Sequence, residues 1–145
     1  MAVVAGVVLS ACGGGATAPS DGGGAVTSGD SGSSEVTFDD HSDPVEFEDH
    51  TGEESVEVEA RDNVFEDTYL EISPGTEVVF INKGRNDHNV YPANEGAFPE
   101  IETSDLTPGE SASITFDEPG DFPYYCTLHA TETAGMIGGV RVTAD

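Results

Sequence analysis

Alternating apolar and polar positions predict a series of short strands in the second half of this chain. Residues 55–59 alternate strictly, as a strand with one buried face does, and Leu70 and Ile72 continue the pattern. Residues 77–81 are apolar on both faces, which predicts a central strand covered on both sides. No segment of useful length has the helical period. Three later segments each gather their large apolar side chains on one face: 111–116, 122–126 and 140–142.

Three Pro-Gly pairs separate the predicted strands. They occur at residues 73–76, 107–110 and 118–121, with proline second and glycine third in each group. This order is typical of a type II turn, because proline presets φ and glycine accepts a positive φ. Short strands joined by such turns predict an all-β fold, and we expect a Greek-key β-sandwich over residues 55–145.

Residues 13–54 have the composition of a flexible linker. They are mostly Gly, Ser, Thr, Ala and acidic residues, and such a stretch does not offset the entropy lost on ordering. The acidic part contains His41 and His50, which we expect to be solvated, although a metal role is conceivable. The sequence therefore predicts three parts: residues 1–12, a disordered linker of residues 13–54, and a folded domain of residues 55–145.

The first residues resemble the end of a secretory signal peptide with a lipobox. Residues 2–9 are apolar, and Leu9-Ser10-Ala11-Cys12 ends in the cysteine that such lipoproteins carry as a lipidated N-terminus. The apolar run is too short for a transmembrane helix. The resemblance implies an exported domain that a lipid on Cys12 anchors to the outer face of the cytoplasmic membrane. No Lys or Arg precedes Arg61, so either a charged segment lies upstream of Met1 or this segment is not a signal.

The charge balance of the chain is extreme. It has 29 Asp and Glu against 4 Lys and Arg, a formal net charge of −25. This field excludes nucleic acid and anionic membrane surfaces as partners. The carboxylates repel one another in dilute buffer, whereas in 1 M salt the screening length is only about 3 Å. Because the acids are spread through the predicted domain as well as the linker, we interpret the surface as that of a salt-loving archaeon's protein.

Soft metal ligands are concentrated near the end of the chain. Cys126, His129 and Met136 lie within eleven residues, and His88 lies upstream in an Asn-Asp-His-Asn segment. A thiolate, two imidazoles and a thioether suit copper that cycles between Cu(I) and Cu(II). Two other chemistries use part of this set: a Cys126–His129 nucleophilic pair, for which no orienting partner is evident, and a zinc site with a fourth ligand. A disulfide to Cys12 is possible in an exported protein, but each cysteine has a local explanation.

The chain resembles the small blue copper proteins, the cupredoxins of the plastocyanin and halocyanin kind. The resemblance implies a cupredoxin-like fold with one type 1 copper ion per chain. It implies three trigonal ligands: His88, Cys126 and His129. It further implies Met136 as the axial ligand and Asn89 as the residue whose side chain ties the two ligand segments together. The matching positions run from Ser55 to Val142 and include Val64-Phe65, Glu77–Asn82, Asp87–Asn89, Gly120–His129 and Gly135–Val142.

The resemblance also implies an activity. Such a protein carries one electron at a time between redox proteins and is no enzyme. Here it would be a membrane-tethered monomer in a respiratory chain, with partners such as a cytochrome or a terminal oxidase. The ligand loop departs from the usual plastocyanin pattern, with six residues between His129 and Met136 instead of four and Leu128 where proline is common. The longer loop leaves Glu132 as a competing axial ligand, and a copper delivery or storage protein of the same fold is the alternative function.

Overall fold

The computed structural model describes residues 35–41 and 43–144. Its contacts divide the chain into two units, residues 1–31 and residues 32–145. The predicted signal segment, Cys12 and the first part of the predicted linker lie outside the described residues, so the second unit alone is treated below. Within its described residues, no helix has the length and apolar character that a membrane crossing requires.

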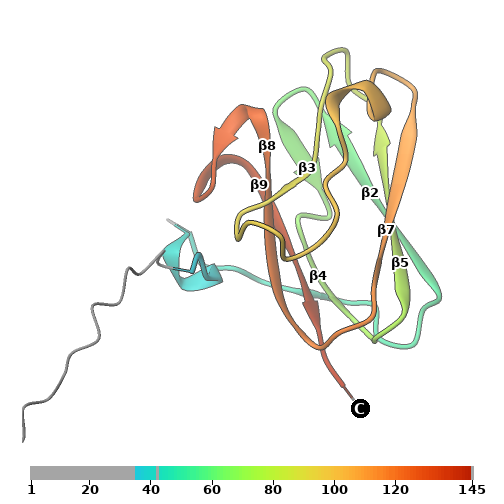
Figure 1. Cartoon of the computed structure of the whole chain (residues 1–145), viewed down its shortest axis with the longest axis vertical. Coiled ribbons are helices and arrows are strands. Elements are labelled where there is room, and N and C mark those ends of the chain that lie inside the picture. The colour runs from blue at the N-terminus through green and yellow to red at the C-terminus, as the bar shows by residue number, and fades with distance from the viewer. Residues whose placement is uncertain (1–34, 42, 145) are drawn as a thin grey trace, which may run out of the picture. The chain divides into compact units, whose positions relative to one another are not determined.

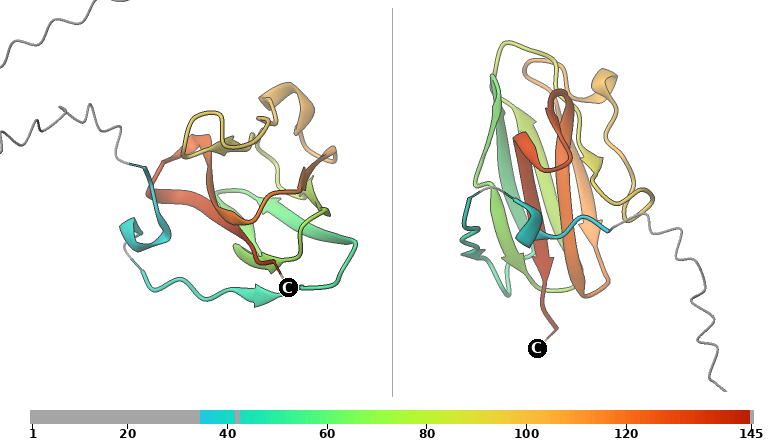
Figure 2. Two further views of the ribbon diagram at one scale, coloured as in Figure 1. Left: turned by 60° about the horizontal axis from the view of Figure 1, so that its bottom comes forward. Right: turned by 90° about the vertical axis from the view of Figure 1, so that its left-hand side faces the viewer.

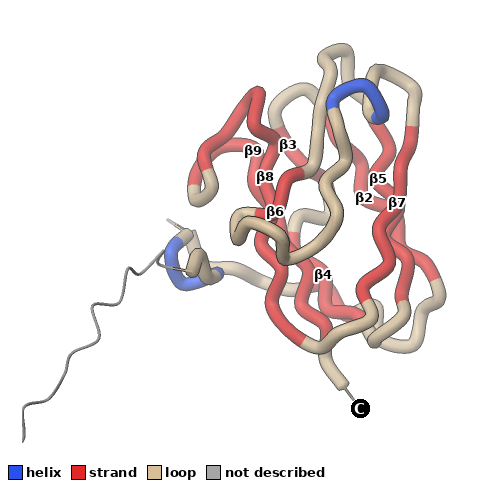
Figure 3. The backbone as a smooth tube through the Cα atoms, viewed as in Figure 1, coloured by secondary structure: helices blue, strands red, loops and turns tan. Residues whose placement is uncertain are grey.

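Nine strands and two short 3-10 turns make up the described part of the chain (Figures 1 and 3). The 3-10 turns are η1, Phe38–Asp40, and η2, Thr103–Asp105. The strands are β1 Glu48–Asp49, β2 Ser55–Arg61, β3 Val64–Glu66, β4 Tyr69–Ile72, β5 Thr76–Asn82, β6 Tyr91–Pro92, β7 Ser111–Phe116, β8 Gly120–Thr131 and β9 Ala134–Val142.

The strands form two sheets that pack face to face, as the right-hand view of Figure 2 shows. One sheet has the order β1-β4-β9-β8-β6 and the other the order β3-β2-β5-β7. Because the chain repeatedly crosses between the sheets, β2 pairs in parallel with β5, and β4 with β9. The predicted all-β sandwich is confirmed. Its core takes alternate side chains from both layers, among them Val56, Val58, Phe65, Leu70, Ile72, Val78, Phe80, Ile114, Phe116, Tyr124, Val140 and Val142.

The strand predicted at residues 77–81 is β5, and it is central in its sheet. Its outward side chains, Val79 and Ile81, are only half-buried, so the prediction that both faces are covered is wrong. A two-layer sandwich buries one face of each sheet, and these two side chains lie on the other face.

Two of the three Pro-Gly pairs form the predicted turns. Gly75 and Gly109 have φ values of +87° and +91°, and backbone hydrogen bonds of 3.2 and 2.9 Å close their turns. The third pair differs. Gly120 has a φ of +155° and already begins β8, where it pairs with Val142, so strand pairing replaces the predicted turn.

The segment upstream of β2 is part of the folded domain. Residues 35–41 and 43–49, called the strap below, cross the outer face of the first sheet, as the right-hand view of Figure 2 shows in cyan. At the β6 edge, the Val36 N–H donates to Asn94 Oδ1 (2.7 Å) and Asn94 Nδ2 donates to the Val36 carbonyl (2.8 Å). At the opposite edge the strap ends in β1, which pairs in parallel with β4. This corrects the predicted boundary, since ordered structure begins upstream of Ser55.

Aromatic side chains hold the strap on the sheet. Phe38 is 7% exposed and lies over Gly139 of β9, where an added Cβ would come within 2.1 Å of the Phe38 ring. The rings of Phe38, Phe47 and Tyr69 meet edge to face, with centroids 5.0 to 5.9 Å apart. The guanidinium of Arg141 lies 4.2 Å from the Phe47 centroid. The strap therefore depends on a glycine in β9 that leaves room for an aromatic ring.

His41 is buried beside this aromatic cluster, which contradicts the prediction of a solvated linker histidine. Its Nδ1 forms a hydrogen bond with the Tyr69 hydroxyl (2.8 Å), and its Nε2 has no hydrogen-bond partner among the described residues. Burial lowers the pKa of His41, and the nearby Asp40 carboxylate opposes that shift only in part. His50 is half-buried instead of solvated, between the carboxylates of Glu48 and Glu53.

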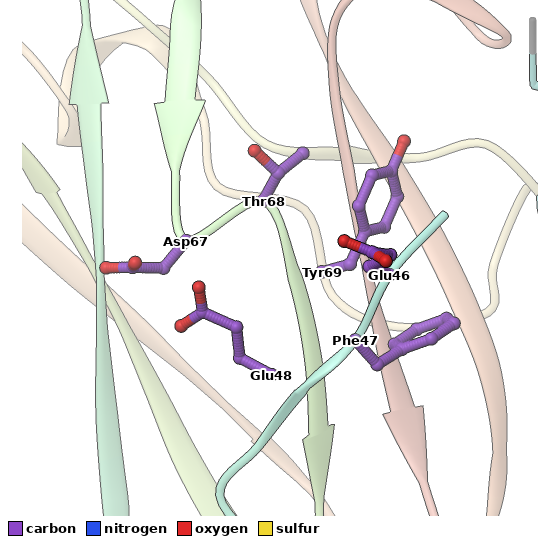
Figure 4. A pocket seen from close by; sticks show the side chains of 6 residues that line it. All are labelled: Glu46, Phe47, Glu48, Asp67, Thr68 and Tyr69. Carbon is purple, nitrogen blue, oxygen red and sulfur yellow. The ribbon is translucent and has the colours of Figure 1, made fainter. Parts of the chain in front are cut away.

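An open pocket lies where the strap meets the turn between β3 and β4. Figure 4 shows the carboxylates of Glu48 and Asp67 at this opening, with the Phe47 and Tyr69 rings at its other side. None of the predicted metal ligands lines it. The full lining is Glu46, Phe47, Glu48, Asp67, Thr68 and Tyr69.

Candidate metal centre

Three of the predicted ligands lie at one irregularity in the β8–β9 hairpin. The pairing register shifts there, so residues 126–129 of β8 lie opposite Met136 alone. Such a bulge interrupts the ladder and re-aims the side chains of the longer strand. The sequence predicted Cys126 at a strand end, but β8 continues through the bulge to Thr131. Cys126 and His129 are therefore placed by the bulge and not by a loop.

Gly135 allows the two strands to come together again beside the bulge. It has a φ of +99°, and a Cβ there would lie 2.7 Å from the carbonyl oxygen of His129 and 3.0 Å from the Cα of Ala130. Any side chain at this position would push β9 away from the segment that carries His129.

His88 reaches the same place from the connection between β5 and β6. It follows β5, and its Nδ1 lies 3.9 Å from Cys126 Sγ, while His129 Nδ1 lies 3.5 Å from that sulfur. The two imidazole centroids are 5.1 Å apart. Within residues 35–41 and 43–144, this trio is the one group of three or more His, Cys, Asp or Glu side chains whose ligand atoms all lie within 4.8 Å of one another.

The spacing of these donor atoms fits a metal ion. Bonds of about 2.3 Å to sulfur and about 2.0 Å to nitrogen that meet at 120° separate the two atoms by about 3.7 Å. The two sulfur–nitrogen distances, 3.5 and 3.9 Å, lie on either side of that value. A thiolate with two imidazoles suits copper in both of its common oxidation states. The residues present therefore fit a copper ion.

The three donors differ in their exposure. His88 and Cys126 are fully buried, and His129 is half-buried. Burial lowers the pKa of His88, the neighbouring His129 lowers it further, and the carboxylates of Asp62 and Asp87 oppose both effects. A lower pKa favours the neutral ring, which offers a nitrogen lone pair to a metal. His129 is the one member of the trio whose ring reaches the surface.

Asn89 joins the two segments that carry the donors. Its Oδ1 accepts a hydrogen bond from the Thr127 N–H (2.9 Å), and its Nδ2 donates to the Thr127 hydroxyl (2.8 Å) and the Thr103 hydroxyl (3.1 Å). Because Asn89 follows His88 and Thr127 follows Cys126, these bonds hold two donors in register across 38 residues of sequence.

Asn82 is a site residue that the sequence interpretation missed. It is fully buried at the end of β5, where its Nδ2 donates to the carbonyls of Asn86 and Leu106, both at 2.8 Å. The Leu106 carbonyl also accepts the His88 N–H (3.2 Å), so Asn82 fixes the segment that carries His88. The sequence signal for Asn82 was its place as a polar residue at the end of an apolar strand, two positions before Gly84.

Met136 is 1% exposed and lies in β9 opposite the bulge. The hairpin continues beyond it, with Thr131 paired to Ala134 and the turn at Glu132 and Thr133. The two additional loop residues therefore lengthen the hairpin instead of displacing Met136. Glu132 is exposed at the hairpin tip and does not belong to the clustered donors. The axial position stays a prediction for Met136, as lipidation does for Cys12.

Comparisons with known proteins agree with this fold and with a copper cofactor. Residues 52–143 match the family described as copper binding proteins, plastocyanin/azurin family. Plastocyanin from Prochlorothrix hollandica is 36% identical over 85 residues, with 54% of this chain and 63% of that protein covered. Amicyanin from Paracoccus versutus is 26% identical with a TM-score of 0.52, and the match covers 61% of this chain and 81% of amicyanin.

The likeness extends to part of an enzyme. A copper-containing nitrite reductase from Thermus scotoductus is 31% identical with a TM-score of 0.52, but the match covers only 22% of that reductase and 61% of this chain. The chain also spans 47% and 54% of two further plastocyanins, from Physcomitrium patens and Hordeum vulgare. These relatives share a domain with this chain and extend beyond it.

The fold and the clustered donors define a two-layer β-sandwich with a Cys-His-His metal site. The chain belongs to the plastocyanin/azurin family of copper binding proteins, and copper is its cofactor. The predictions of a cupredoxin-like fold and of a copper cofactor are confirmed.

Proposed function

We propose that this protein carries single electrons on one type 1 copper ion and performs no catalysis of its own. The observation that carries the proposal is the buried trio of His88, Cys126 and His129, with sulfur–nitrogen distances that fit a trigonal metal site. The likenesses to plastocyanin and amicyanin support a carrier, and the likeness to the nitrite reductase covers only 22% of that enzyme.

The chain's residues have separate tasks in this function. Cys126 and the two imidazoles hold the ion, and copper supplies the one-electron couple when bound. The hydrogen bonds of Asn89 and Asn82 hold the segments that carry the donors in place. The donors would therefore move little when the charge of a bound copper ion changes. The sandwich core excludes water from His88, while the half-exposed ring of His129 brings the site to the surface.

We further propose a halocyanin-like carrier from a salt-loving archaeon, tethered outside the cytoplasmic membrane by a lipid on Cys12. Its donor and acceptor are redox proteins of a respiratory chain, such as a cytochrome or a terminal oxidase. The lipobox-like residues before Cys12 and the net charge of −25 support this proposal. A diacyl modification is expected, because one acyl chain binds a membrane only marginally. Mass spectrometry of native protein should find a lipid mass on Cys12, and an unmodified cysteine would contradict the tether.

The copper carrier is tested by colour and by voltammetry. Addition of Cu(II) to the copper-free protein should give an intense blue absorbance, and voltammetry should give a reversible one-electron wave. Cys126→Ser should abolish the colour while the sandwich stays folded, because the thiolate is lost and a hydroxyl of similar size replaces it. Cys12→Ser is the matched control and should stay blue. A blue Cys126→Ser variant would contradict the ligand assignment, and a blue protein without reversible voltammetry would favour copper storage or delivery.

A further inference from the structure

Three of the four cations of this chain are gathered at one end of the sandwich. Of its four Lys and Arg residues, Arg61 ends β2, and Lys83 and Arg85 follow β5. The N–H groups of Lys83 and Gly84 both donate to the carbonyl of Ala60, at 2.9 and 3.1 Å, so the two cation-bearing segments lie side by side. This distribution is uneven for a chain of net charge −25.

These segments contact the metal site. A Cβ added to Gly84 would lie 3.3 Å from His88 Nε2 and 2.6 Å from the Asp62 backbone nitrogen. The His88 ring in turn packs against His129, with 5.1 Å between centroids. Figure 1 shows the ends of β2 and β5 and the β8–β9 hairpin at the same upper end of the domain. The cations thus flank the surface at which His129 is half-exposed.

The three cations at this end share it with the carboxylates of Glu59, Asp62, Glu66 and Asp87. Arg61 forms ion pairs with Glu59 and Glu66, and Asp62 lies beside it. Lys83 and Arg85 are both exposed, and among the described residues neither has a carboxylate within 4 Å. Their charges are therefore free to meet an external partner.

Exposed apolar side chains occur at the same end. Leu128 is 51% exposed and precedes His129, and Val64 is 49% exposed and pairs with Arg61. Within the described residues these are the two large hydrophobic side chains that stand out to solvent. An apolar centre with charges at its rim is typical of a protein interface.

We propose that Lys83 and Arg85 dock a redox protein that presents carboxylates beside its own redox centre. The proposal rests on the proposed electron-carrier function. In 1 M salt the screening length is about 3 Å, so the net charge no longer repels an acidic partner and only charges in contact count. Charge pairs at the rim of an interface determine the orientation of the two proteins more than their affinity. Electron transfer through one exposed ligand requires such an orientation.

The test compares two variants with the same change in net charge. Lys83→Gln/Arg85→Gln removes two positive charges beside the site, and Ser55→Glu/Ala144→Glu adds two negative charges at the opposite end, on exposed residues at the start of β2 and after β9. Stopped-flow oxidation of the reduced copper protein is measured at 0.2 M and 2 M KCl with hexacyanoferrate(III), an anion, and with tris(phenanthroline)cobalt(III), a cation. The blue absorbance of all three proteins is checked first.

The proposal predicts that the position of a charge relative to His129, and not the net charge alone, determines the rate of electron transfer. At 0.2 M KCl, Lys83→Gln/Arg85→Gln should react about three- to tenfold more slowly with the anion and faster with the cation, whereas Ser55→Glu/Ala144→Glu should change either rate less than about twofold. On a carboxylate-terminated gold electrode, the first variant should lose most of the wild-type voltammetric current and the second should keep it. Equal effects of the two variants would overturn the docking proposal and leave the carrier function intact. An absence of blue colour in every protein would overturn the carrier function itself.

Discussion

Replacement of Asn89 by alanine tests whether the hydrogen bonds between the ligand segments stabilise the site. The change removes three hydrogen bonds, two to Thr127 and one to Thr103. Each such bond contributes about 0.5–1.5 kcal/mol net, and Thr127 is exposed enough for water to replace part of the loss. We therefore expect Asn89→Ala to lower the free energy of unfolding by about 2–4 kcal/mol. For a domain of this size the midpoint of thermal unfolding should fall by roughly 8–15 °C.

The assay is thermal unfolding of copper-free protein in molar KCl, followed by circular dichroism. Asn86→Ala is the matched control, because the exposed Asn86 side chain forms no hydrogen bond with the described residues. Its free energy of unfolding should change by less than about 0.5 kcal/mol. Added copper should raise the midpoint of Asn89→Ala less than that of wild type, since misplaced donors bind the ion more weakly. Equal midpoints for the two alanine variants would refute the reasoning.

Three further outcomes are expected. Met136→Leu should keep the blue colour, because the three strong donors remain, and should raise the reduction potential measured by voltammetry. If Met136→Leu leaves both the spectrum and the potential unchanged while Glu132→Ala alters them, Met136 is not the axial ligand. Burial lowers the pKa of His41 below its ordinary 6.5, so the unfolded chain binds the proton first as the pH falls. Unfolding midpoints should therefore be highest above about pH 6.5 and decline toward pH 5, with a smaller decline in His41→Gln. Dilution from molar to millimolar KCl should lower the midpoint of the copper-loaded protein, since screening of the −25 charge is lost; a constant midpoint would mean that the acids are too dispersed to matter.

The sequence predicted those features that depend on neighbours along the chain. The alternation from Ser55 and the apolar face of residues 111–116 correspond to β2 and β7, because one-sided burial acts on every second residue. The spacing of Cys126 and His129 indicated a metal site because both ligands lie within four residues of one another in the sequence. The bulge that holds them was not predictable, since it depends on how β8 pairs with β9, which is a property of two strands together.

The strap was not predictable because the residues that it contacts are distant in sequence. Phe38 and Phe47 each have one apolar residue two positions upstream, Val36 and Val45, but neither pair continues into an alternation of strand length. Their partners, Tyr69, Gly139 and Arg141, lie on strands from the middle and the end of the chain. The composition of residues 35–49 therefore resembles a linker, although their packing makes them part of the domain.

The strap makes the folding unit longer than the part of the chain that the family shares. A shortened chain that begins at residue 52 would keep the whole family match but lose β1, Phe38 and Phe47. The outer face of β9 at Gly139 would then be exposed, and β4 would become a free sheet edge open to pairing with another molecule.

The strap also determines where the preceding chain enters the domain. Without it, the entrance would be at Ser55, the start of β2, at the end of the sandwich farthest from the donors. With it, the entrance is at Glu35 and Val36, which line one pocket with Asn94 and with Glu132 at the tip of the ligand-bearing hairpin. The first described residues of the domain therefore lie on its flank beside the hairpin that carries the donors, and not at its far end.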